Sequence, residues 1–400
     1  MNISICIANK NYLINNYTEQ MTLRDVCAIN DIPCESVSFY YINKDEGYKI
    51  LTGLNKQIFS LKEITDHLII RPDRNINYLD LKRKPLKIKK TENASSEYTF
   101  ANSSENILEH YELTPSDCKE FICAKVKEFI KDDVLKLTDK PIVMGISGGG
   151  DSNNLIRSFL ESGLIDKSQL IAVMMLGVPD WDLGKGRAEA ICREYDIPLR
   201  FVDSNQVNNL LGRTKQTDWV TDFEKSFPEV DLEVLGTLAV RLSLSSVARE
   251  LNAQAIVIGL NLEDLLAESF LQVCKGKLPL PYPVRVIDDI QVWYPLYQCP
   301  KKILDGSYPK YSLDNYLDRY PSKLIGCAVP YYLAQMVHSV LPGAEYDLLN
   351  GFKRLSHTNK DYGLFDSDIG FSILEFLPLK DRKKWNEFKG VKEQLYNDAQ

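Results

Sequence analysis

Residues 141–152 read Pro-Ile-Val-Met-Gly-Ile-Ser-Gly-Gly-Gly-Asp-Ser, an apolar run that leads directly into a loop of three glycines. Glycine lacks a Cβ atom, so such a loop can adopt positive φ angles and turn successive backbone N–H groups toward an anion. Apolar residues at helical spacing follow over residues 153–160, and a helix N-terminus favours negative charge. The stretch therefore predicts a strand, a phosphate-binding loop and a helix; the alternative is a glycine-rich turn without a ligand.

The residues of this loop are the candidate ligands of a phosphate group: Ser147, Gly148, Gly149, Gly150, Asp151 and Ser152. The loop lacks the Gly-Lys-Ser/Thr ending of a Walker A loop and the spacing of the dinucleotide-binding G-x-G-x-x-G motif. It resembles the Ser-Gly-Gly-x-Asp-Ser PP-loop of the ATP pyrophosphatases, the adenine nucleotide alpha hydrolase-like proteins. The resemblance implies an enzyme that cleaves ATP between the α and β phosphates and forms an adenylated intermediate.

Short aliphatic runs alternate with helical patterns around this loop. The candidate strands are residues 142–146, 170–176, 199–202 and 255–258, and the candidate helices are residues 116–131, 153–161, 185–195 and 235–251. Continuous apolar strands are typical of parallel strands buried on both faces. The pattern predicts a doubly wound parallel α/β sheet of the HUP and PP-loop type, with its ligand at the carboxyl ends of the strands. The resemblance implies that adenine lies against the second strand, near Met175 and Leu176.

Length and composition limit the classes of protein. A chain of 400 residues, 44% apolar and 26% charged, predicts a globular protein of two or three domains. It contains no run of 18 apolar residues and no signal-peptide pattern, so we expect a cytoplasmic protein without a membrane partner. The formal net charge of −7 disfavours a tRNA partner, although a local basic patch leaves that partner open. Nine cysteines without a C-x-x-C pair argue against a zinc ribbon.

The first part of the chain predicts a separate small domain. Strand-like runs occupy residues 3–8, 36–42, 48–51 and 67–71, and a helix over 23–30 follows Thr22 as its N-cap. This order predicts an α+β domain of the β-grasp type over residues 1–80. Such a domain offers a surface for a partner protein or for a second copy of the chain.

Composition divides the rest of the chain. Residues 81–112 are basic and then rich in Ser, Asn and Glu, which predicts a solvated linker. The PP-loop domain is predicted over residues 113–310. Residues 311–400 predict a helical C-terminal region that caps the site, with amphipathic patterns at 313–319, 330–341 and 380–388.

A second motif follows the fourth candidate strand and reads Gly259-Leu260-Asn261-Leu262-Glu263-Asp264. Carboxylates that face a triphosphate would repel it unless a divalent cation lay between them, and magnesium prefers one or two carboxylates with phosphate oxygens and water. We therefore predict that Asp151, Glu263 and Asp264 hold Mg²⁺, and that Gly259 contacts the nucleotide. The alternative is a helix whose first turn carries ordinary acidic residues.

The segment from Glu263 to Gln272 resembles the acidic motif of the tRNA 2-thiocytidine and 2-thiouridine synthetases, and the likeness continues through Lys275-Gly276-Lys277. Residues 293–296, Trp-Tyr-Pro-Leu, followed by Lys301-Lys302-Ile303, resemble the Pro-Leu strand and next helix of the same families. The likeness spans residues 138–310 and does not reach either terminal region.

The departures from these families concern sulfur transfer. Their C-x-x-C pair, which with a third cysteine holds an iron–sulfur cluster, corresponds to residues 233 and 236, and this chain has Glu233 and Gly236 there. Without thiolates the cluster cannot be ligated, so we expect no iron–sulfur cluster. The family histidine after the glycine is Leu260. Arg241 remains on the same helix and is predicted to contact a phosphate or the substrate; an exposed helix arginine is the alternative.

These residues predict an AMP- and pyrophosphate-forming ligase that uses ATP and Mg²⁺. It would adenylate a carbonyl or carboxyl oxygen of a small molecule or a protein for displacement by a nitrogen nucleophile. The predicted catalytic residues are Asp151, Ser152, Asp264 and Arg241. One alternative is thiolation through a persulfide on Cys274, although its apolar neighbours favour a packed core thiol. The other is a nucleotide-sensing binding protein.

Overall fold

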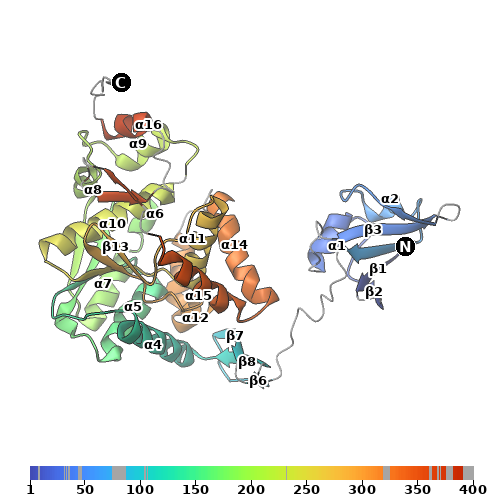
Figure 1. Cartoon of the computed structure of the whole chain (residues 1–400), viewed down its shortest axis with the longest axis horizontal. Helices are drawn as coiled ribbons and strands as arrows, with labels where there is room; N and C mark the ends of the chain where they lie inside the picture. Colours follow the sequence, from blue (N-terminus) through green and yellow to red (C-terminus); the bar gives the residue numbers. More distant parts are fainter. Residues whose placement is uncertain are drawn as a thin grey trace. The chain divides into compact units, whose positions relative to one another are not determined.

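The computed structural model divides into two compact units, Met1–Lys84 and Pro85–Gln400 (Figure 1). It describes residues 1–7, 10–30, 32, 34, 37–43, 47–73, 87–102, 105, 107–230, 232–318, 325–359, 363–366, 369, 371–374 and 382–390. Each unit has its own hydrophobic core.

The first unit is a five-stranded sheet crossed by one helix, with these elements: β1 (Asn2–Ile7), β2 (Lys10–Ile14), α1 (Leu23–Ile29), β3 (Val37–Asn43), β4 (Gly47–Ile50), α2 (Ile58–Leu61) and β5 (His67–Pro72). The strand order is β2-β1-β5-β3-β4, and β1 runs parallel to β5 while the other pairs are antiparallel. Thr22 and Asp25 form the capping box that begins α1. This is the strand order of a β-grasp domain, so the predicted α+β fold of this unit is confirmed.

The second unit begins with a small sheet where the sequence predicted a linker. Strands β6 (Lys87–Lys89), β7 (Ser96–Asn102) and β8 (Ile107–Leu113) pair in the order β6-β8-β7. Its polar composition misled the prediction, because the sheet is fixed by distant partners: the Ser95 and Ser96 hydroxyls donate to the carbonyls of Gly306 and Lys302 at 2.6 and 2.7 Å. The linker prediction is thus wrong for these strands, and residues 81–86 lie outside the described part.

The main sheet has the order β11-β10-β9-β12-β14-β13. Strands β9 (Ile142–Gly145), β10 (Leu170–Met175), β11 (Leu199–Val202), β12 (Ala255–Val257) and β14 (Ile290–Trp293) are parallel, and β13 (Val284–Ile287) is antiparallel to β14. The chain moves from β9 to β10 and β11, then crosses back to β12 on the other side of β9. The strand order thus reverses between β9 and β12, and doubly wound sheets bind ligands at the carboxyl ends of the strands at such a point.

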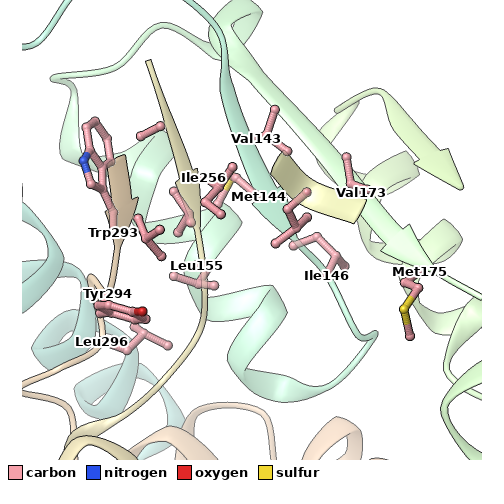
Figure 2. Packing of buried hydrophobic residues seen from close by; sticks show 14 of the residues in the cluster. Val143, Met144, Ile146, Leu155, Val173, Met175, Ile256, Trp293, Tyr294 and Leu296 are labelled. Carbon is pink, nitrogen blue, oxygen red and sulfur yellow. The ribbon is translucent and has the colours of Figure 1, made fainter. Parts of the chain in front are cut away.

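Helices cover both faces of this sheet: α4 (Pro115–Asp132), α5 (Gly150–Ser162), α6 (Pro179–Asp182), α7 (Lys185–Tyr195), α8 (Ser204–Leu210), α9 (Trp219–Ser226), α10 (Leu232–Glu250), α11 (Leu262–Cys274) and α12 (Lys301–Ser307), with a 3₁₀ turn at Lys167–Gln169. Figure 2 shows the aliphatic residues of β9, β10 and β12 packed with Leu155 of α5. The predicted doubly wound α/β sheet is confirmed.

The C-terminal region is mostly helical, with α13 (Pro309–Asp318), α14 (Ile325–Val340), α15 (Ala344–Ser356) and α16 (Arg382–Lys389). Strands β15 (Gly363–Asp366) and β16 (Phe371–Leu374) form an antiparallel hairpin that the sequence did not predict. Helices α14 and α15 pack against α11 (Figure 1). Among the described helices none has both the length and the apolar character needed to cross a membrane.

Candidate active site at the carboxyl edge of the sheet

The glycine loop joins β9 to α5 and has the form of an anion cradle. Gly148 has a φ of +79°, and Gly149 is the N-cap of α5 without any side-chain hydrogen bond to the helix. The first-turn N–H groups of α5 are therefore not capped by a side chain of the N-cap residue. The Ser152 hydroxyl accepts from the Ser147 N–H at 2.9 Å and lies 3.2 Å from the Ser147 hydroxyl.

The rear of the loop is held by the start of α7. A Cβ added at Gly148 would lie 2.4 Å from the carbonyl oxygen of Gly184, and one at Gly184 would lie 2.2 Å from that of Ser147. Arg187 donates from Nε to the Gly148 carbonyl at 3.1 Å and pairs with Asp318 at 2.5 Å. The loop is thereby fixed by backbone contact. Arg187 was not predicted from the sequence, because its partners lie far away in the chain.

Lys301 lies beside the loop and was also missed. Its Nζ is 3.2 Å from both Asp151 carboxylate oxygens and 2.9 Å from Asp305. Burial acts to lower the pKa of Lys301, but the carboxylates of Asp151 and Asp305 outweigh it and the pKa is raised. Lys301 is the first residue of α12, a position where a cation opposes the helix dipole unless acidic groups face it. A lysine at the first position of a helix is therefore the feature of the sequence that could have indicated nearby carboxylates.

The two acidic residues of the second motif have different surroundings. Glu263 is buried and accepts from the Lys301 backbone N–H at 2.9 Å, so it caps α12. Asp264 forms a capping box with Asn261 at the start of α11. The capping role that was the alternative for this motif is therefore present.

Tyr331 of α14 is influenced by the charges of four acidic residues around the glycine loop and the second motif. Burial raises its pKa, and so do the charges of Asp264, Glu263, Asp151 and Asp305. In the described part, no group of three or more His, Cys, Asp or Glu residues is placed to hold a metal ion. Magnesium usually takes one or two carboxylates and completes its shell with phosphate oxygens and water, so a magnesium site does not require three such side chains. The assignment of Mg²⁺ to Asp151, Glu263 and Asp264 stays a prediction.

Glu263 gives a prediction for the dependence of stability on pH. Burial raises its pKa to about 7, well above the ordinary value of about 4.5 for a glutamate. The folded protein then binds a proton that the unfolded chain releases, so this group stabilises the fold at low pH and the contribution is lost as pH rises from about 4.5 to 7. We expect Glu263→Gln to remove up to about 3 kcal/mol of this pH dependence. Urea unfolding of both proteins at several pH values measures it; parallel curves would contradict it.

Arg241 lies on the inner side of α10 and is only 4% exposed. The alternative of an exposed helix arginine is therefore wrong. Burial lowers the pKa of Arg241; the neighbouring Tyr294 and Glu268 oppose this effect and Arg285 adds to it. Its predicted contact with a phosphate or the substrate stays a prediction.

The two positions that correspond to the cluster cysteines differ in their surroundings. Glu233 is exposed, whereas Gly236 faces the indole of Trp181, and an added Cβ there would lie 2.3 Å from the ring. The space beside Gly236 is thus filled by an aromatic ring. Cys274 is exposed, so its interpretation as a packed core thiol is wrong. The expectation that the protein holds no iron–sulfur cluster stays a prediction.

The predicted adenine contacts lie at the end of β10. Met175 is buried, and the Leu176 N–H donates to the Val202 carbonyl at 2.8 Å. The next N–H, that of Gly177, donates to the Asp182 carboxylate at 3.0 Å. Both N–H groups are therefore engaged within the protein. Gly259 follows β12, on the opposite side of β9, and its added Cβ would lie 3.2 Å from Leu155.

A cleft of about 640 Å³ adjoins the glycine loop. It shares Asp305 with the Lys301 ion pair, and a Cβ added at Gly150 would lie 2.5 Å from its lining hydroxyl, Ser312 Oγ. The lining contains three carboxylates and one lysine: Glu97, Glu112, Asp305 and Lys302. Lys302 pairs with Glu97 at 3.2 Å and Lys301 pairs with Asp305, so among these three carboxylates Glu112 is the one without a lysine partner in the described part.

No protein-family model matches the chain, and no curated protein sequence does. Its structure is similar to that of the U34-tRNA thiolase NcsA from Methanococcus maripaludis, solved with its 4Fe-4S cluster: the TM-score is 0.52 at 19% identity, over 67% of this chain and 89% of that one. Weaker similarity links it to the NMN synthetase from Francisella tularensis, with TM-score 0.37 and 15% identity over 64% and 99% of the two chains. The NH3-dependent NAD synthetase from Campylobacter jejuni gives 0.35 and 13% over 61% and 96%. Together with the strand order, the first of these likenesses shows the fold of this chain, a doubly wound α/β sheet of the HUP and PP-loop type.

Proposed function

We propose that this chain is an ATP-dependent enzyme that adenylates a carbonyl or carboxyl oxygen and releases pyrophosphate. The observation that carries the proposal is the glycine loop at the N-terminus of α5, which lies where the strand order of a doubly wound sheet reverses. Its uncapped first-turn N–H groups suit an anion with several oxygens. Lys301 adds a positive charge beside Asp151.

In the proposed reaction the acceptor oxygen attacks the α phosphorus, and the bond from this phosphorus to the bridging oxygen breaks. Pyrophosphate leaves with that electron pair. A nitrogen nucleophile then attacks the activated carbon, AMP leaves with the C–O bond pair, and the nitrogen gives up a proton. The protein positions the groups and neutralises charge. Magnesium, when bound, would supply further neutralisation of the phosphates, held by Asp151 and Asp264.

Two observations support nitrogen over sulfur as the nucleophile. The indole of Trp181 fills the space beside Gly236, where the thiolating families have a cysteine. The cleft beside the loop carries the Glu112 carboxylate, which has no lysine partner in the described part and suits an amine that is cationic before it reacts. Cys274 ends α11, and the 13-residue helix places it roughly 18 Å from the residues that begin it. This separation weakens the persulfide alternative.

The products of ATP turnover test the proposal. We expect AMP and pyrophosphate in equal amounts when the protein is incubated with Mg²⁺, cell extract and ATP labelled at the α or γ phosphate. The label from the γ position should appear in pyrophosphate, and the label from the α position in AMP. Accumulation of ADP would contradict the mechanism, and absence of turnover with retained ATP binding would favour the nucleotide-sensing alternative.

Asp264→Asn tests the magnesium assignment. If Asp264 holds the cation, the variant should need several-fold more Mg²⁺ for half-maximal activity, because a carboxylate ligand is lost. If the side chain only caps α11, the change should cost about 0.3–1 kcal/mol of stability and leave the magnesium midpoint unchanged. A magnesium titration of activity beside a thermal melt separates the two results. We expect the higher magnesium requirement.

The acceptor is proposed to be a small molecule or a protein. Binding of a partner or a second copy through the β-grasp unit stays a prediction.

A further inference from the structure

Two arginines of the second unit, Arg241 and Arg285, are buried, and the charge of Arg285 acts on that of Arg241. Arg285 of β13 is fully buried, and it donates to the Glu268 carboxylate at 2.6 Å and to the Pro281 carbonyl at 2.9 Å. Arg241 of α10 is 4% exposed, and its Nε is buried without a hydrogen-bond partner. Within the described residues neither a hydrogen bond nor an ion pair is found for Arg241.

Arg241 lies at the level of the glycine loop. Helix α10 returns the chain to the start of β12, so it runs antiparallel to β9, and Leu244 packs against Gly145 at the end of β9. Arg241 is three residues closer to the N-terminus of α10, which places it beyond the carboxyl end of that strand. It therefore faces the same edge of the sheet as the proposed nucleotide site.

Tyr294 supplies a second polar group. It directly follows β14 (Figure 2), it is fully buried, and its hydroxyl has no hydrogen-bond partner in the described part of the chain. Arg285 stacks over its ring at 5.1 Å, and the charge of Arg241 is influenced by both residues. A guanidinium and a phenol thus share one buried region.

An unpaired buried charge costs several kcal/mol, and a fold retains it only where an anion compensates it. The two guanidinium groups and the Glu268 carboxylate give this region a net charge of +1. A monovalent, planar carboxylate matches that charge and the forked geometry of a guanidinium. A phosphate dianion would leave an uncompensated negative charge.

We propose that Arg241 and Tyr294 bind a carboxylate group of the acceptor substrate. The identification of the ligand as the acceptor substrate rests on the proposed adenylating function. The anion site itself stands on the buried, unpartnered donors.

The test uses the full-length protein without ATP and follows its melting temperature in acetate, benzoate, inorganic phosphate or chloride, at up to about 50 mM and equal ionic strength. Acetate or benzoate should raise the melting temperature of the wild type saturably. Arg241→Met should lose this response, and Tyr294→Phe should weaken its midpoint at least fivefold. Without an added anion, Arg241→Met should melt at or above the wild-type temperature, because an unpaired charge is removed. Arg285→Met is the matched control and should melt lower, because Glu268 loses its partner.

Three results would overturn the proposal: a carboxylate response that persists in Arg241→Met, a destabilisation of Arg241→Met as large as that of Arg285→Met, or a response to phosphate alone. Absence of any carboxylate response in the wild type would overturn it too. ATP–pyrophosphate exchange, measured separately, tests the adenylating function, so failure of one leaves the other standing.

Discussion

Replacement of Asp151 by asparagine, or of Ser147 by alanine, is expected to lower pyrophosphate release at least about 100-fold, the loss typical when one preorganised polar group is removed from such a site. Asp151 positions the Lys301 ammonium and is the leading candidate ligand for magnesium. Ser147 contributes the hydroxyl next to Ser152 in the loop. In Asp151→Asn, Lys301 keeps Asp305 as an ionic partner, so the fold should be retained.

The measurement is pyrophosphate release beside a thermal melt. Asp196→Asn is a suitable control, because Asp196 is an exposed carboxylate in a surface ion pair with Lys167 and asparagine tolerates its positive φ. We expect the control to keep wild-type activity. Near wild-type turnover in either loop variant, with an unchanged melting temperature, would remove the glycine loop from the catalytic site.

Gly148→Ala is expected to reduce the free energy of unfolding by about 3 kcal/mol or more and to abolish ATP turnover. A non-glycine residue at this positive φ costs about 1–2 kcal/mol by itself. The new Cβ would also lie 2.4 Å from the Gly184 carbonyl oxygen and 3.0 Å from the Ala188 nitrogen. Both are backbone atoms that cannot rotate away, so the loop and α7 must move apart.

Gly186→Ala is the matched control on the same helix. Gly186 is the second residue of α7, and a Cβ there meets no atom within 4 Å. Alanine at a position whose backbone it can adopt stabilises a protein by about 0.4–1 kcal/mol, because it restricts the unfolded chain. Urea unfolding should therefore show a small gain for Gly186→Ala and a large loss for Gly148→Ala. Equal stability of the two variants would mean that the contact between the loop and α7 is not rigid.

The local parts of the site were predictable from sequence. The glycine loop between an apolar strand and a helix, and the acidic residues after β12, lie at the predicted places because each depends on short-range pattern. The prediction of a linker failed at strands β6–β8, because polar composition does not reveal that these residues form a sheet. Strands β6–β8 look like a linker in sequence, but Tyr98 in β7 is buried, donates to Glu345 at 2.8 Å and stacks on His338.

Local patterns were enough to predict the alternation of strands and helices, the loop that suits an anion and the absence of a cysteine pair in α10, because backbone preference and residue identity are local properties. The distant groups that meet in the site could be found only from the folded chain. It brought Lys301 to Asp151, packed Trp181 against Gly236 and buried Arg241 beside Tyr294. Such contacts depend on how the helices pack on the sheet, and this packing cannot be inferred from short stretches of neighbouring residues.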